Sequence, residues 1–370
     1  MKAVPIADRS VGDGHPCFVI AEAGVNHNGS LKMARQLVDV AADAGAEAVK
    51  FQTFRACDMV VRSAPKAEYQ LRTTSVDESQ FEMIHRLELS PEAHAELIEL
   101  CRRRGIEFLS SAFDSESLRL LTERFGLPRL KIPSGEVTNG PLLLQAGRSG
   151  REVILSTGMS TLGEVETALG ALAFGYCRMA GRPSVPAFRD AFVSAEGKAV
   201  LLEKVVLLQC TTEYPAPFDD VNLRGMDSLR AAFGLPVGLS DHTPGICVAI
   251  AAAARGAAVL EKHFTLDRSL PGPDHATSLE PGELQTMVRS IRQVQDALGS
   301  PHKSPALSEL KNRDIARKSL VAARPIPVGT VMTEQDLAIK RPGNGVSPLL
   351  FWDYLGRPAD RDYETDEQLQ

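Results

Sequence analysis

The sequence of 370 residues contains no uninterrupted apolar run long enough to cross a bilayer, which takes about eighteen residues or more. Residues 1–10 also lack the apolar core of a signal peptide. We therefore expect a cytoplasmic protein with no membrane contact.

Basic clusters are also missing. The chain has 41 Lys and Arg against 47 Asp and Glu, which gives a net charge of −6. A nucleic-acid partner is not expected, because such proteins gather Lys and Arg on one face. An anionic substrate would have to be bound by individual lysines.

The cysteines show no paired spacing. Six of them are scattered along the chain, mostly beside apolar residues, which predicts neither a zinc site nor a disulfide framework. We expect buried free thiols at Cys17, Cys57, Cys101, Cys177, Cys210 and Cys247.

No G-x-G-x-x-G motif follows the first predicted strand, which argues against an open dinucleotide-binding sheet. Instead, short apolar runs alternate with segments of helical period, such as 30–44 and 91–104, with Ser30 and Ser90 as caps. This alternation predicts a (β/α)8 barrel. The predicted strands are Phe18–Ala21, Ala46–Phe51, Ile106–Leu109, Arg129–Ile132, Val153–Leu155, Val205–Leu208, Pro236–Leu239 and Ala257–Leu260.

The predicted barrel domain spans residues 1–297, and residues 1–16 form a hairpin that closes its floor. A Ser-, Pro- and Lys-rich linker follows at 298–312, and a small domain at 313–370 packs against its own barrel or that of another subunit. Two connections, 55–90 and 176–198, are longer than a barrel needs. Each connection either covers the active site as a lid or has no role in function.

Candidate functional residues follow the predicted strands, because the carboxyl ends of parallel strands meet at one rim of a barrel. His242 and His263 end neighbouring strands and could share a divalent metal. Lys50, Lys131 and several hydroxyls suit a small anion, and Glu22 and Glu136 form an acid/base set. The complete group of strand-end residues is Glu22, Lys50, Gln52, Ser111, Lys131, Ser134, Glu136, Ser156, Thr212, Tyr214, Ser240, His242 and His263.

Four further histidines are less informative. His85 and His94 lie on predicted helices, and we expect both at the surface. His27 and His275 lie in loops after the first and last strands, and their roles stay open.

The segments IAEAGVNHNGS, AVKFQTF, APKAEYQ, LKIPSGE, STGMS, CTTEYPAPF, GLSDHT and EKHFT, in this order, resemble the sialic acid synthase family of nonulosonate synthases. The segment VAARPIPVGTVMTEQDLAIKRPGNG resembles the antifreeze-like SAF module that these enzymes carry. Thr212 in CTTEYP is similar to the legionaminate branch, where the sialic acid branch has Asn. The resemblance extends over residues 17–358.

This resemblance implies that phosphoenolpyruvate condenses with the open-chain aldehyde of an N-acetylated hexose, either N-acetylmannosamine or a diacetamido-trideoxyhexose. The products are phosphate and a nine-carbon 2-keto acid. It further implies a Mn²⁺ or Mg²⁺ ion on His242 and His263, Glu136 as acid/base, and a domain-swapped homodimer in which Arg341 reaches the acetamido group. Phosphoenolpyruvate would contact Lys50, Lys131, Ser134, Ser156 and Ser240; the sugar would face Glu22, Gln52, Tyr214 and Asp274; and Ser111 and Thr212 are assigned to substrate binding as well.

Two other functions remain open at this point. A Schiff-base aldolase would use the amine of Lys131 or Lys50. A carbohydrate-binding or structural protein would use its SAF module only as an interaction surface.

Overall fold

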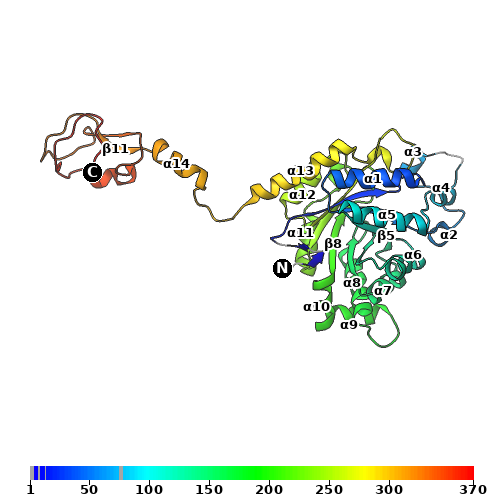
Figure 1. Cartoon of the computed structure of the whole chain (residues 1–370). Coiled ribbons are helices and arrows are strands. Elements are labelled where there is room, and N and C mark those ends of the chain that lie inside the picture. Colours follow the sequence, from blue (N-terminus) through cyan, green and yellow to red (C-terminus); the bar gives the residue numbers. More distant parts are fainter. Residues whose placement is uncertain (1–3, 7–8, 13, 75–77) are drawn as a thin grey trace. The chain divides into compact units, whose positions relative to one another are not determined.

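The computed structural model describes residues 4–6, 9–12, 14–74 and 78–370. The chain divides into two compact units, Met1–Gly299 and Ser300–Gln370 (Figure 1). Within the described ranges, no helix combines the length and the apolar character needed to cross a membrane.

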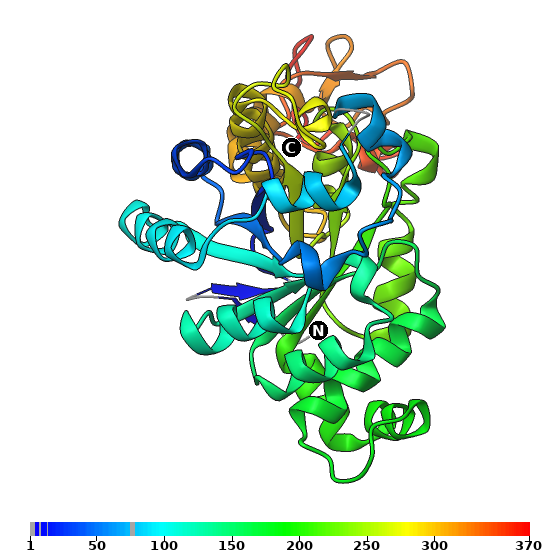
Figure 2. The ribbon, with the colours of Figure 1, turned by 90° about the vertical axis from the view of Figure 1, so that its right-hand side faces the viewer.

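The first unit contains a closed barrel of parallel strands, seen in Figure 2 with its surrounding helices. Neighbours along the chain are neighbours in the barrel, and the last strand closes the ring against the first. The predicted (β/α)8 barrel and its eight strands are confirmed, with shifts of a few residues at their ends. These strands are β3 (Phe18–Gly24), β4 (Ala48–Thr53), β5 (Glu107–Ala112), β6 (Arg129–Ile132), β7 (Glu152–Ser156), β8 (Val205–Cys210), β9 (Val237–Asp241) and β10 (Val259–His263).

Alternation along the strands separates two faces. In β3, Phe18 and Ile20 join an apolar cluster inside the barrel, whereas Val19 and Ala21 pack under the helices. Glu22, two residues beyond Ile20, therefore belongs to the inward-facing set at the carboxyl end. The same period of two places polar residues from every strand at that end.

Helices surround the barrel, and two of them begin at the predicted caps. The Ser30 side chain caps α1 (Leu31–Asp43), which buries Leu37 and Val38 against the barrel. Ser90 caps α5 (Pro91–Arg104), and Gly105 ends it in the left-handed conformation with φ of 68°. The other helices of this part are α6 (Ser115–Arg119), η1 (Leu120–Arg124), η2 (Ser134–Glu136), α7 (Gly140–Arg148), α8 (Leu162–Tyr176), η3 (Phe218–Asp220), α11 (Gly225–Phe233), α12 (Cys247–Ala254), η4 (His275–Thr277) and α13 (Pro281–Leu298).

The amino end of the barrel is closed by a hairpin and by charge pairing. Strands β1 (Val4–Ile6) and β2 (Arg9–Val11) pair antiparallel, and Val11 joins the apolar cluster inside the barrel. Nearby, the buried Arg129 guanidinium binds Glu107 and Glu152 at 2.6 and 3.0 Å. Both arrangements seal this end against water.

The two long connections have different positions. Residues 176–198 contribute α9 (Val185–Val193) and part of α10 (Ala195–Lys204), which pack on the outer face of α8. Contact there is close enough that a Cβ at Gly170 would lie 2.3 Å from the Phe188 carbonyl oxygen. Residues 55–90 form α2 (Ala56–Met59), α3 (Glu68–Thr73) and α4 (Gln80–Arg86), and they line a pocket at the carboxyl end. The first connection is an insertion on the outer face of α8, and the second is part of the site.

The second unit has a small core of its own, built around Leu320, Ile326, Leu337 and Tyr363. Its strands β11 and β12 pair antiparallel. Its elements are α14 (Leu307–Ala316), β11 (Ser319–Ala322), β12 (Leu337–Lys340), η5 (Pro348–Leu350) and α15 (Phe351–Tyr354).

Two expectations about side-chain burial were wrong. Cys57 and Cys247 are exposed, because each lies in the first turn of a helix at the rim of the barrel. His94 is fully buried, because it lies three residues before Leu97 on the inner face of α5. The His94 ring is held at 2.8 Å from the Thr53 hydroxyl. His85 is exposed as predicted.

Candidate active site

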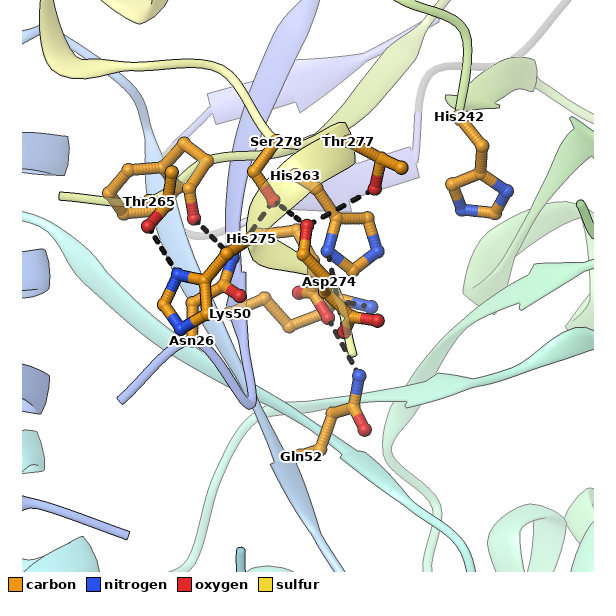
Figure 3. Close-up of polar contacts among 12 residues, drawn as sticks. Asn26, Lys50, Gln52, His242, His263, Thr265, Asp274, His275, Thr277 and Ser278 are labelled. Atoms are coloured by element: carbon orange, nitrogen blue, oxygen red, sulfur yellow. Dashed lines mark hydrogen bonds and ion pairs between the residues drawn. The ribbon is translucent and has the colours of Figure 1, made fainter. Parts of the chain in front are cut away.

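The two histidines predicted to act together lie side by side at the carboxyl end. His242 directly follows β9 and His263 ends the neighbouring β10, so their ring centroids are 5.5 Å apart. Both are less than 9% exposed, at 8% and 7%. The Tyr214 ring lies 4.2 Å from that of His242 and 5.7 Å from that of His263. Figure 3 shows both imidazoles together with Lys50, Gln52 and Asp274.

Hydrogen bonding determines which imidazole nitrogens are free. His242 Nδ1 donates to the Thr211 carbonyl at 2.7 Å, so in the neutral ring the lone pair is on Nε2, which lies 3.5 Å from the Ser240 hydroxyl. His263 Nδ1 is buried without a hydrogen-bond partner and lies 3.9 Å from an Asp274 oxygen. Burial, helped by the neighbouring His242 and Lys50, places the pKa of His263 well below its usual value. A neutral imidazole with an unused nitrogen is suited to binding a divalent metal.

The number of available ligands is small. Across the residues that the structure describes, no group of three or more His, Cys, Asp or Glu side chains is arranged around a common metal position. The protein would therefore supply two nitrogen ligands and leave the other coordination positions open.

Four ionisable side chains form a buried cluster beside the histidines. Lys50 Nζ lies 3.3 Å from Glu22 and 2.9 Å from Glu261. Lys131 Nζ lies 3.4 Å from the other oxygen of Glu261. All four side chains are at most 4% exposed, so each charge depends on its neighbours. Ser111 accepts a hydrogen bond from Lys50, and Ser240 donates one to Glu261.

The cluster gives its members different proton affinities. Burial opposes ionisation of Glu261, but Lys131 and Lys50 outweigh it and hold the pKa of Glu261 well below its usual range. Burial raises the pKa of Glu22 despite the attraction of Lys50. Burial also lowers the pKa of Lys131, whereas Glu22 and Glu261 raise the pKa of Lys50 against the effect of burial. The cluster therefore contains one firmly ionised carboxylate and one carboxyl that can change its protonation state.

A hydroxyl-lined cradle adjoins this cluster. A Cβ at Gly158 would lie 2.3 Å from Thr212 Oγ1 and 2.9 Å from Ser134 Oγ, so only glycine fits there. The hydroxyl oxygens of Thr212 and Ser156 are buried without hydrogen-bond partners. Unpaired donors near a lysine suit a bound anion.

A cavity of about 180 Å³ adjoins His263 on another side. Its lining includes Gln52, Tyr214, His263 and Asp274, all of which were predicted from the sequence. Gln52 donates to Glu22 at 3.4 Å, and burial raises the pKa of Asp274 to about 6. This cavity is where an uncharged substrate could lie beside the imidazoles.

Two predicted residues are not joined to these groups. Glu136 lies on η2 after β6, half-buried, where Asn139 donates to it at 2.6 Å. Burial raises the pKa of Glu136 even though the Asn139 hydrogen bond opposes the shift. Arg341 lies in the second unit, where its Nε donates to the Ala316 carbonyl at 3.0 Å. Its assignment to a sugar remains a prediction.

Sequence reasoning missed Glu261, although its signal was present. Val259, Glu261 and His263 alternate along β10, so a strand that aims His263 inward aims Glu261 inward too. Cys210 was also missed; its sulfur lies 3.9 Å from His242 Nδ1.

A buried ion pair behind the histidines was missed as well. Lys262 Nζ binds Asp241 at 2.8 Å and the Thr243 carbonyl at 2.5 Å. Each of these charged residues is adjacent in sequence to one of the two histidines. The pair joins the ends of β9 and β10 and so positions the two imidazoles.

This fold and site define a barrel enzyme that works at the carboxyl ends of its strands. The chain belongs to the NeuB family, whose sequence model matches residues 37–303, and a SAF domain follows at residues 317–370. The resemblance found in the sequence is thereby confirmed.

Individual relatives agree with this family. The chain is 47% identical to the N,N'-diacetyllegionaminic acid synthase of Campylobacter jejuni over 353 residues, which cover 95% of this chain and 98% of the relative. It is 44% identical to the enzyme of the same name from Legionella pneumophila, over 91% of this chain and 88% of that one. Among solved structures, the N-acetylneuraminic acid synthetase of Leptospira borgpetersenii, in complex with citrate, matches with a TM-score of 0.67 at 31% identity, covering 84% of this chain and 95% of that chain.

Proposed function

We propose that this chain condenses phosphoenolpyruvate with the open-chain aldehyde of an N-acetylated hexose, releasing phosphate and forming a nine-carbon nonulosonic acid. The acceptor is N-acetylmannosamine or a diacetamido-trideoxyhexose. The similarity of the chain to two N,N'-diacetyllegionaminic acid synthases supports the second of these. The proposal rests on the position of two places beside neighbouring imidazoles. The cradle for an anion lies next to Cys210, whose sulfur is 3.9 Å from His242 Nδ1, and the cavity for an uncharged substrate is lined by His263.

Phosphoenolpyruvate carries a phosphate and a carboxylate, and the site contains two lysines to offset them. Lys50, Lys131 and the hydroxyls of Ser134, Ser156 and Ser240 bind this substrate in the proposal. Placing its enol carbon beside the aldehyde replaces a bimolecular encounter with an oriented one. The buried positions of these groups strengthen each electrostatic contact.

The reaction forms a bond between the enol carbon and the aldehyde carbon. Positive charge then develops on the carbon that bears the phosphate oxygen, and the Glu136 carboxylate stabilises it. Water adds to this carbon as Glu136 accepts its proton, which passes to the oxygen of the former aldehyde. Phosphate then leaves with cleavage of the carbon–oxygen bond, and the added hydroxyl becomes the keto group as its proton goes to the phosphate. Phosphoenolpyruvate, aldehyde and water thus give the keto acid and phosphate. Glu22, Gln52, Tyr214 and Asp274 orient the sugar.

His242 and His263 would hold a Mn²⁺ or Mg²⁺ ion, since the buried free nitrogen of His263 and the lone pair on His242 Nε2 fit such a group. When bound, the ion would act as a Lewis acid toward the aldehyde oxygen.

Phosphate release tests the proposed activity. The full chain is mixed with Mn²⁺, phosphoenolpyruvate and each of a panel of N-acetylated hexoses, and phosphate and the new keto acid are quantified. Release of one phosphate per keto acid supports the synthase. If no acceptor releases phosphate, the synthase is excluded and a carbohydrate-binding role is favoured.

The buried amine of Lys131 also fits the second candidate, a Schiff-base aldolase, because burial lowers its pKa toward the neutral form. Treatment with borohydride and a keto acid separates the two activities. The aldolase would form a stable adduct with the protein, and the synthase would form none.

The role of Arg341 and the domain-swapped dimer can be tested by subunit mixing. If Arg341 completes the partner's site, His242→Ala and Arg341→Met chains are each nearly inactive alone. A mixed dimer would then contain one intact site, and mixing would restore activity. Absence of recovery in verified mixed dimers would remove the swapped arrangement.

A further inference from the structure

The turn that carries Glu136 is fixed at both of its ends. It begins with η2, where the backbone N–H of Gly158, in the loop after β7, donates to the Ser134 hydroxyl at 2.9 Å. It ends at Asn139, which caps α7, and α7 buries Leu143 in the barrel core. The backbone of Glu136 is therefore held between two neighbouring elements.

The side chain of Glu136 receives its hydrogen bond, within the described part of the chain, from the amide of Asn139. The Asn139 Nδ2 lies 2.6 Å from Oε2 of the carboxyl group, and the Asn139 backbone N–H donates to the Glu136 carbonyl oxygen at 3.0 Å. A glutamate side chain has several rotatable bonds, and this one is only half-buried. Without the contact to Asn139, the carboxyl group could take several orientations.

The helix cap determines which way the Asn139 amide points. Asn139 is followed by Gly140 and Pro141, and proline has no backbone N–H. The side chain therefore caps the N–H of Leu142, which donates to Asn139 Oδ1 at 3.2 Å. Because Oδ1 accepts from the backbone, the Nδ2 of the same amide is the atom that faces Glu136. The carboxyl group consequently receives a donor, which favours its ionised form.

The surroundings of Glu136 oppose this ionised form. Burial is the main effect and raises the pKa of Glu136; the Asn139 hydrogen bond lowers it, and the negative charge of Asp114 raises it further. Asp114 is held in place by Ser117, whose backbone N–H and hydroxyl each donate to it at 2.7 Å, and by the Arg55 backbone. The Asn139 amide is the group that counteracts burial and Asp114.

In the proposed reaction, on which this inference rests, Glu136 acts as a carboxylate that stabilises positive charge and then accepts a proton from water. Both steps need a carboxyl group that is ionised and aimed at one carbon. We propose that Asn139 is a positioning residue for this reaction, which fixes the orientation of the Glu136 carboxylate and keeps it ionised. The second oxygen, Oε1, is left for the substrate and the water.

Two substitutions separate this role from that of a simple helix cap. Asn139→Ser keeps a residue that caps helices well but removes the donor to Glu136. Asn139→Asp also keeps the cap and adds a negative charge beside the carboxylate. If Asn139 served only α7, both variants would behave like the unmodified chain. Ser184→Ala, which removes the cap of the outer helix α9, is the control for the loss of a cap.

The first readout is phosphate release as a function of pH. We expect Asn139→Ser to lower kcat about 10- to 100-fold near neutral pH, with KM for phosphoenolpyruvate unchanged, because a hydrogen bond to a charged group is lost. The acidic limb of the kcat profile should move to higher pH by about one unit, and further in Asn139→Asp, since both changes make proton loss from Glu136 harder. Ser184→Ala should keep the profile of the unmodified chain. Unmoved profiles in both folded Asn139 variants would overturn the inference.

The second readout does not depend on turnover. The pKa of Glu136 is measured by NMR on the full chain with isotopically labelled glutamate carboxyl carbons, and Glu136→Gln identifies its signal. We expect this pKa to rise in both Asn139 variants, and an unchanged value would overturn the inference even in an active chain. A rise in a chain that releases no phosphate with any acceptor would mean that the proposed function fails while the contact between Asn139 and Glu136 stands.

Discussion

Strand β6 carries two buried cations on the same inward face, one at each end of the barrel. At the amino end, Arg129 is 1% exposed, and all three of its guanidinium nitrogens bind Glu107 or Glu152. At the carboxyl end, Lys131 is 2% exposed and shares Glu261 with Lys50. The two cations are only two residues apart, yet their surroundings differ.

The amino end is satisfied within the protein, whereas the carboxyl end is not. At the carboxyl end, the hydroxyls of Ser156 and Thr212 and His263 Nδ1 are buried without hydrogen-bond partners. Buried polar atoms without partners lower stability and are retained where a ligand supplies the missing contacts. The amino end of the barrel therefore stabilises the fold, whereas the carboxyl end leaves polar groups available to substrate.

The largest effect is expected at the imidazoles. His242→Ala or His263→Ala should lower kcat by more than about 1000-fold, because the metal's effect on the aldehyde is worth several kcal/mol. Excess chelator should abolish turnover of the unmodified chain, and added Mn²⁺ should restore it. His85→Ala, at an exposed helical position, serves as the control. Full turnover in chelator would contradict a metal role.

Substituting each of the two cations of β6 tests the comparison directly. Lys131→Met should lower kcat/KM for phosphoenolpyruvate about 100-fold or more, with little change in the free energy of unfolding. Arg129→Met should lower the free energy of unfolding by about 3 kcal/mol, because it leaves two carboxylates without their cation, and should leave the kinetics of the folded protein nearly intact. Denaturant unfolding and phosphate release measure both quantities. Equal losses of activity in the two variants would show that the amino and carboxyl ends of the barrel do not differ in function.

The ion pair behind the histidines should have an intermediate effect. Lys262→Met leaves Asp241 buried without its cation and loosens the ends of β9 and β10, so metal affinity should fall about 10-fold. Lys262→Arg should retain part of the metal affinity that Lys262→Met loses. The readout is the concentration of free Mn²⁺ in a titration followed by electron paramagnetic resonance, which does not depend on turnover. Unchanged affinity in a folded Lys262→Met protein would assign the pair to stability alone.

The smallest effect concerns how the free energy of unfolding depends on pH. Burial raises the pKa of Glu22 in the folded protein, so between the unfolded and folded pKa values the folded chain binds more protons and its stability falls as pH rises. Glu22→Gln removes this titration. We expect the variant to lose less stability than the unmodified chain from about pH 5 to about pH 8, by on the order of 1 kcal/mol. Glu166→Gln, on the exposed face of α8, should follow the unmodified chain. Parallel curves for Glu22→Gln and the unmodified chain would contradict a raised pKa.

Much of the barrel and many of the site residues could be predicted because their signals are local. Apolar runs that end in polar residues mark the strands, and Ser30 and Ser90 mark helix starts within one turn. Glu261 follows the same period of two, because it lies two residues before His263 on β10. The burial of His94 can be predicted only if the helical period of apolar positions is extended to include a polar residue.

The alternation of strands and helices and the identity of the polar residues at the strand ends follow from the amino-acid sequence alone, because they depend on contacts between residues close along the chain. The folded chain was needed to show that Glu261 stands between two lysines, that one long connection lines the cavity beside His263 while the other packs outside, and that the two ends of β6 have different partners. The reason is ring closure: β10 meets β3 across more than two hundred residues of chain, and the charge of each buried group depends on neighbours that only this closure supplies.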